Sequence, residues 1–269
     1  AFAPALVQET IVAGLPVSEA ARLHLELAGL LADRPEGPLP AGEVARHLRA
    51  AGPLVDTPRL VRWELEAAGE ATAALAHEEA VGHYEAALAA LPDGAERAEA
   101  LLGLGHARDR AGRRGPARGA FAEAAAIARR REDARLLTRA ALGHGGLAVV
   151  IAGADPEVTA LLGEALAAVP PDERASAARL RARLAVELYY ADPARSRDLS
   201  GRAVEDARVA DDPSALAAAL NAHRVALWDP DHIDERLATA DAMVAAAERA
   251  GDREAALQGR NWRVVDLLE

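Results

Sequence analysis

Short amphipathic segments, separated by recurring helix breakers, constrain the fold of this chain most strongly. Along nearly every segment apolar residues recur at i, i+3, i+4 and i+7, the pattern of an α-helix with one buried face. We expect about ten or eleven helices, with aspartate before proline capping the next helix and short turns joining antiparallel hairpins. The breaks are Gly37-Pro38, Gly52-Pro53, Pro92-Asp93-Gly94, Gly112, Asp155-Pro156, Pro170-Pro171, Asp192-Pro193, Asp212-Pro213, Asp229-Pro230 and Gly251-Asp252.

Small and aromatic residues recur at matching positions of successive hairpins. The matching sets are Ala68, Ala80, Tyr84, Ala87 and Pro92; then Leu101, Leu104, Gly105, Ala117, Phe121 and Ala124; then Leu142, Gly143, Leu162, Ala165 and Pro170. This spacing is typical of the tetratricopeptide repeat, whose period is about 34 residues. Small residues let helices approach closely, and the aromatic residue fills the remaining gap. The sequence therefore predicts an all-α, right-handed, tetratricopeptide-like solenoid of antiparallel helix hairpins, with weaker repeats on either side of residues 68–170.

The composition agrees with closely packed helices and excludes several kinds of site. AVILMFWYC residues make up 51% of the chain but aromatic residues only 3%, so alanine, leucine and valine supply the apolar surface. The absence of cysteine excludes disulfides and thiolate metal sites. A net charge of −11 disfavours direct nucleic-acid binding and anionic membrane surfaces. We expect a soluble, cytoplasmic protein without a membrane span.

Several runs of the sequence resemble the helical-repeat region of large ATP-dependent transcriptional regulators of actinobacteria, the LuxR-type and antibiotic-regulator-type proteins of the STAND ATPase class. These runs are residues 77–88, 220–224, 227–230, 235–237, 249–253 and 258–269. Phe2, residues 5–9 and residues 22–24 are similar to the end of the winged-helix part of that family's nucleotide-binding domain, although Pro4 and Gln8 replace its usual histidine and arginine. The resemblance implies that residues 1–53 are the tail of a winged-helix and ATPase junction and that residues 54–269 are the repeat solenoid.

The resemblance also implies a non-catalytic sensor or scaffold arm, preceded by an ATPase and often followed by a DNA-binding domain. We expect a segment of a larger protein, because the only methionine is Met243 and the chain ends inside an amphipathic pattern. The chain has no GxxxxGK[ST] motif and no lysine, so it contains no phosphate-binding loop. No enzyme, cofactor or metal site is expected, since no HxxxH or HExxH pair occurs.

Residues without an evident chemical role receive packing interpretations. The glycine-rich run of residues 143–146 is interpreted as a site of close packing or a helix kink. His24 and His47 are expected at helix junctions, and Trp63, Trp228 and Trp262 are expected to fill gaps between hairpins.

One set of residues is a candidate binding surface. Position 9 of the first helix in such repeats is expected to line the concave side, where solenoids hold their partners. These positions are His106, His144, Val186, His223 and Arg260, with Asp109, Tyr189 and Arg263 nearby. Histidine and arginine side chains suit an acidic peptide, a carboxylate ligand or pH-sensitive docking. The other interpretation is that they are unrelated polar residues facing solvent.

The leading functional hypothesis is an interaction or effector-sensing arm whose partner is a protein, a peptide or the adjoining ATPase domain of the same chain. One alternative is a small-molecule sensor with a pocket between hairpins, lined by the inserted residues 149–151. Another is self-association into a homo-oligomer through the bare apolar face of the last helix.

Overall fold

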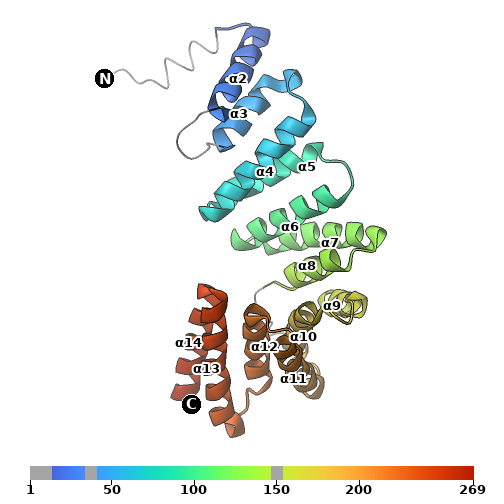
Figure 1. Ribbon diagram of the computed structural model, residues 1–269, viewed down its shortest axis with the longest axis vertical. Coiled ribbons are helices and arrows are strands. Elements are labelled where there is room, and N and C mark those ends of the chain that lie inside the picture. The colour runs from blue at the N-terminus through green and yellow to red at the C-terminus, as the bar shows by residue number, and fades with distance from the viewer. Residues whose placement is uncertain (1–13, 34–40, 147–153) are drawn as a thin grey trace, which may run out of the picture. The chain divides into compact units, whose positions relative to one another are not determined.

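The structure, a computed structural model, describes residues 14–33, 41–146 and 154–269 (Figure 1). Within these ranges the chain forms thirteen α-helices and two short 3-10 helices, and it forms no strand. The α-helices are α2 (Val17–Ala32), α3 (Ala41–Ala51), α4 (Thr57–Ala73), α5 (His77–Ala90), α6 (Ala95–Arg110), α7 (Arg114–Arg131), α8 (Ala134–Gly145), α9 (Pro156–Ala168), α10 (Arg174–Leu188), α11 (Pro193–Val209), α12 (Pro213–Ala226), α13 (Ile233–Ala250) and α14 (Arg253–Leu268). From α2 to α6 and from α8 to α14 each helix packs against the next, which confirms the predicted all-α helical-repeat fold.

The chain divides into two compact units, unit 1 (Ala1–Ala120) and unit 2 (Phe121–Glu269), and the division falls inside α7. The junction that the sequence predicts after residue 53 lies inside unit 1, where the 3-10 helix η1 (Gly52–Leu54) separates α3 from α4. Pro4, Gln8 and residues 149–151 lie outside the described ranges. No described helix is long and apolar enough to cross a membrane.

Five of the helix ends that the structure describes share one backbone conformation, which stops the helix and reverses the chain. At each of these ends the residue just past the helix has a positive φ, between 50° and 76°. These residues are Leu75, Gly112, Glu132, Asp211 and Gly251. In each case the next residue donates its N–H to the carbonyl five positions earlier, as in the 2.8 Å bond from Ala76 to Ala71. This is the Schellman motif. The turns at Leu75 and Glu132 contain neither glycine nor proline, so the sequence-based count missed two helix breaks.

The predicted aspartate caps are present where the structure describes them. The carboxylates of Asp155, Asp192 and Asp212 accept backbone N–H groups of the following helix, at 2.8 to 3.1 Å in the shortest case for each. Each of these aspartates precedes the proline that begins α9, α11 or α12. Each aspartate thereby pairs an N–H group that would otherwise lack a partner at the helix start. This confirms the prediction that aspartate before proline caps the next helix.

Aromatic rings lie directly on glycine residues of the following hairpin. In unit 2, Phe121 is 1% exposed, and its ring occupies the space that a Cβ atom at Gly143 would need. This confirms close packing at the glycine-rich run, where α8 also ends. In unit 1, the ring of Tyr84 lies in the same way on Gly103 rather than on Gly105, the residue that the repeat pattern singles out. Close helix contact therefore depends on glycine at both positions.

Most of the expected packing residues are at helix contacts. The Nδ1 atoms of His24 and His47 are 2.8 Å apart between α2 and α3, and Trp63 is only 4% exposed. Trp228 differs from the prediction because it is 39% exposed, and its ring covers a buried arginine instead of filling a gap between hairpins.

Candidate functional site

A cavity of about 280 Å³ lies in unit 2 on the first helices of three successive hairpins, α8, α10 and α12. We call it the unit 2 cavity. Its apolar lining residues are small or medium in size, and its polar ones are two arginines and an asparagine. It is lined by Leu142, Gly146, Arg179, Ala182, Arg183, Val186, Ala218, Asn221 and Ala222. Four of these residues, at 179, 182, 183 and 186, follow the i, i+3, i+4, i+7 spacing of one face of α10.

Ion pairs hold the arginines of this cavity in place. Arg179 donates to both carboxylate oxygens of Asp212, at 2.9 and 3.1 Å. Burial alone would raise the pKa of Asp212, but the backbone N–H of Ala215 and the charge of Arg179 outweigh it and lower that pKa. Arg183 pairs with the buried Glu187 and donates to the carbonyl of Gly145 at 2.7 Å. Both guanidinium groups therefore have fixed positions at the cavity wall.

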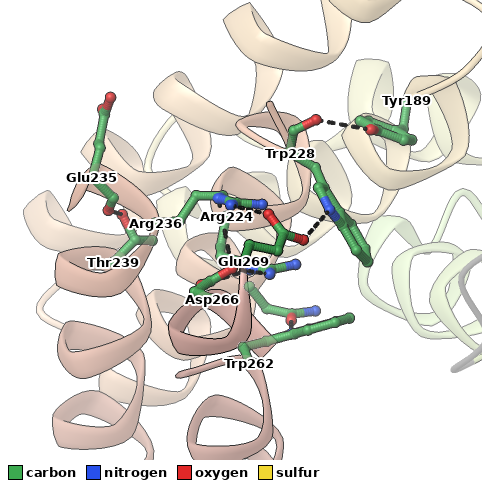
Figure 2. A network of polar contacts seen from close by, with 10 residues as sticks. Tyr189, Arg224, Trp228, Glu235, Arg236, Thr239, Trp262, Asp266 and Glu269 are labelled. Carbon is green, nitrogen blue, oxygen red and sulfur yellow. Dashed lines mark hydrogen bonds and ion pairs between the residues drawn. The ribbon is translucent and has the colours of Figure 1, made fainter. Parts of the chain in front are cut away.

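Asn221 connects this cavity to a buried polar network at α14. Its side-chain oxygen accepts a hydrogen bond from the indole N–H of Trp262 at 2.7 Å. The guanidinium carbon of Arg224 lies 4.2 Å from the centre of the Trp262 ring and 4.5 Å from that of Trp228, and Arg224 is 0% exposed. Figure 2 shows Arg224 together with these two tryptophans.

The charges of this network hold α14 against α12 and α13. Arg224 forms an ion pair with Asp266, and Nε of Arg236 lies 3.5 Å from the same carboxylate (Figure 2). The three side chains are 0% exposed, so each charge depends on the others for stabilisation. Arg236 also donates to Glu269, and this hydrogen bond lowers the pKa of Glu269. The network thus lies beside the cavity, to which Asn221 connects it.

Tyr189, a predicted site residue, belongs to the rim of this network. Its hydroxyl donates to the carbonyl of Trp228 at 3.3 Å (Figure 2). The rings of Tyr189 and Tyr190 meet edge-on, with their centres 4.6 Å apart. Burial, followed by the neighbouring Tyr190, raises the pKa of Tyr189. The hydroxyl therefore stays protonated at neutral pH and acts as a hydrogen-bond donor.

The other predicted residues occupy different surroundings. Among the predicted position-9 residues, Val186 lines the cavity. His144 lies on α8 and is 7% exposed, whereas Arg260 and Arg263 on α14 pair with Glu248 and Asp241 of α13 at 2.7 and 3.4 Å. His106 and Asp109 lie on α6 in unit 1. The sequence reasoning missed Arg179, Arg183 and Asn221. The two arginines lie seven and three residues before Val186, a spacing that could have indicated a shared face of α10, whereas Asn221 lies two residues before His223 and carries no such signal.

His223 lies between α11, α12 and α13 with few polar contacts. Its Nδ1 is 3.1 Å from the hydroxyl of Ser200, and its Nε2 is 3.9 Å from Glu235. Burial lowers the pKa of His223, and the charges of Arg197 and Arg208 lower it further against the opposing effect of Glu235. The neutral imidazole is thus the form that the fold favours.

We predict that the protein loses stability as the pH falls below about 6.5, the ordinary pKa of histidine. His223 and His47 both have lowered pKa values in the folded chain, so in this range the unfolded chain binds more protons. Urea unfolding midpoints at pH 7.5 and 5.5 measure the loss. His223→Gln should show a smaller loss than the unsubstituted protein, and an equal loss in both would contradict the role of His223.

The described residues contain no group of three or more histidine, aspartate or glutamate side chains placed to hold a metal ion.

Comparison with known proteins gives no family: no family model and no curated protein matches the sequence. Among solved structures, the chain is similar to that of BtubC (BKLC) from P. vanneervenii, with 20% sequence identity and a TM-score of 0.46. The similarity covers 91% of this chain and 92% of that chain.

Proposed function

We propose that this chain is a non-catalytic, partner-binding arm, and that its unit 2 cavity receives an extended segment of a protein partner. The observation that carries the proposal is that three successive first helices, α8, α10 and α12, contribute residues to one cavity. In repeat folds, the corresponding face of successive repeats forms a continuous surface on which partners bind. The cavity volume of about 280 Å³ suits one or two side chains of a bound peptide.

The lining of the cavity indicates the chemistry of the bound segment. Leu142, Val186 and three alanines offer apolar surface to a hydrophobic side chain. Arg179 and Arg183 lie beside this surface and provide planar donors that suit a carboxylate. The segment that fits both features is an extended peptide in which a hydrophobic residue is adjacent to an acidic one.

We further propose that this arm belongs to a cytoplasmic, ATP-dependent transcriptional regulator. The support is the resemblance of residues 77–88, 220–224, 227–230, 235–237, 249–253 and 258–269 to the repeat region of such regulators. In this setting the arm would pass partner binding to the adjoining ATPase domain by favouring one of two arrangements of the chain. DNA contact would belong to another domain, because the present residues carry a net charge of −11.

Two other functions each have one supporting observation. A small-molecule effector is favoured by the partly enclosed, largely apolar unit 2 cavity. Self-association is favoured by the outer face of α14, where Leu257, Val264 and Leu268 are 67%, 55% and 82% exposed. Thermal shift with a metabolite panel and light scattering against concentration distinguish these two from peptide binding.

The proposal predicts that Ala218→Trp strongly weakens peptide binding. Ala218 lines the cavity and is exposed, so an indole there would fill the cavity without entering the core. The probe is a fluorescein-labelled peptide in which leucine is flanked by glutamates, followed by fluorescence anisotropy. We expect a loss of affinity of at least about tenfold, because the indole would exclude the hydrophobic side chain of the peptide from the cavity.

Matched controls separate occlusion of the cavity from a general effect. Ala245→Trp introduces the same side chain at an exposed position of α13 that does not line the cavity, and it should bind the peptide normally. Replacing the glutamates of the peptide by lysine should weaken binding to the unsubstituted protein. Equal binding by both tryptophan variants, or no binding of the acidic peptide at all, would contradict the proposal.

A further inference from the structure

A second cavity, of about 550 Å³, lies in unit 1 between α3 and α5. We call it the unit 1 cavity. Its volume is in the range of sites that hold small molecules, and the side chains around it are almost all polar. It is lined by Gly42, Glu43, Arg46, Arg49, Glu79, Gly82 and His83. The two glycines lie on its two helices, and neither adds a side chain to the space between them.

A buried carboxylate supports one wall of this cavity. Glu64 on α4 is 0% exposed, and its carboxylate accepts a hydrogen bond from Nδ1 of His83 at 2.7 Å. The Nε atom of Arg49 lies 3.0 Å from the other carboxylate oxygen. Burying a carboxylate is unfavourable unless such partners are present. An apolar residue at this position would pack equally well, so packing alone does not explain a glutamate here. The placement of Glu64 is explained if it orients the two cavity residues that it contacts.

The contact with Glu64 determines which nitrogen of His83 carries hydrogen. A carboxylate only accepts hydrogen bonds, so Nδ1 is the donor, and Nε2 of a neutral imidazole is an acceptor. Nε2 lies 3.9 Å from a carboxylate oxygen of Glu79. A Cβ atom at Gly42 would lie 3.7 Å from the same nitrogen. Two acceptors, Nε2 of His83 and the carboxylate of Glu79, are therefore next to each other at the cavity.

Positive charge is supplied by the facing helix. Arg46 and Arg49 lie one turn apart on α3, so they share one side of that helix. Arg49 uses Nε for its ion pair with Glu64, which leaves its terminal nitrogens for another partner. Arg46 contacts Nε2 of His47 at 3.4 Å, a long and weak interaction. The guanidinium groups of Arg46 and Arg49, together with the carboxylate of Glu43, thus line the cavity on the α3 side, and the acceptors of Glu79 and His83 line it on the α5 side.

We propose that the unit 1 cavity binds a small zwitterion of the amino-acid class. Its carboxylate would pair with Arg46 and Arg49, and its ammonium group would donate to Glu79 and His83. A ligand with a single charge would be attracted by one of these two groups of side chains and not by the other. A zwitterion carries a charge that is complementary to each of them. This site is independent of the unit 2 cavity and would make the arm responsive to a metabolite as well as to a protein partner.

The test is isothermal titration calorimetry of the protein with each of the common amino acids, and with acetate and methylammonium as probes that carry one charge. We expect at least one amino acid to bind and both single-charge probes to bind far more weakly. Arg46→Gln and Glu79→Gln should each weaken binding about tenfold or more, because each removes a charge-assisted hydrogen bond. Both side chains are exposed, so the fold should be retained.

Glu66→Gln is the matched control, since Glu66 is exposed on α4 and does not line the cavity. It should bind the amino acid as the unsubstituted protein does. The proposal is overturned if no amino acid binds, if acetate or methylammonium binds as tightly, or if Glu79→Gln and Arg46→Gln bind as well as Glu66→Gln.

Discussion

Asp266→Asn is expected to lower the free energy of unfolding by about 3–5 kcal/mol. The side chains of Arg224, Arg236 and Asp266 are 0% exposed, and Asp266 is the carboxylate that both arginines contact. Asparagine keeps the shape of the side chain but removes its charge. Arg224 would then be buried without a counter-ion, and Arg236 would keep only its contact with the partly exposed Glu269.

The measurement is urea unfolding followed by circular dichroism and by tryptophan fluorescence, to which Trp228 and Trp262 beside Arg224 contribute together with Trp63 of unit 1. Asp241→Asn is the control, because Asp241 forms an exposed pair with Arg263 at 3.4 Å on the neighbouring helices α13 and α14. An exposed pair contributes only about 0–1 kcal/mol. Equal losses in the two variants would show that the buried network does not stabilise α14 as described.

Gly143→Ala is expected to destabilise the protein by about 1–3 kcal/mol, although alanine favours helices more than glycine does. The added Cβ would overlap the ring of Phe121, which is 1% exposed and has no room to move aside without shifting α7 or α8. The steric cost should therefore exceed the gain in helix propensity. Thermal unfolding and urea unfolding both measure this difference.

Gly163→Ala, in the helix α9 of the same unit, is the matched control. A Cβ atom there would meet no other atom within 4 Å. Only the propensity effect remains, so stability should rise by about 0.5–1 kcal/mol. Opposite signs for the two substitutions are the expected result, and a stabilised Gly143→Ala variant would contradict the ring-on-glycine contact.

The starts of helices were predicted well from the sequence where a residue type has one main structural role, such as capping a helix. The aspartates before proline at 155, 192 and 212 cap helices as expected, because aspartate supplies a side-chain acceptor and proline supplies a backbone preset for the first turn. The turns at Leu75 and Glu132 could not be predicted in this way. Both residues adopt φ above 50°, a conformation that their own propensities disfavour and that the backbone hydrogen bond closing each turn stabilises.

The candidate sites were less accessible to sequence reasoning than the helices. Position 9 of the repeat led to Val186, but the arginines and the asparagine beside it become cavity residues only through the packing of α8, α10 and α12 against one another. The pairing of Arg224 with Asp266 joins residues far apart in the sequence. Arginine and aspartate in amphipathic helices usually face solvent, so no local pattern indicates that these two are buried.

The most direct test of the proposed function is to locate a bound peptide on the protein. The same glutamate-flanked peptide, carrying a photoreactive analogue of leucine at its central position, would be crosslinked to the protein and the attachment sites mapped by mass spectrometry. We predict crosslinks at Ala182, Val186, Ala218 and Ala222, which line the unit 2 cavity. Crosslinks confined to the outer face of α14, or spread over both units without enrichment at these residues, would contradict the proposal.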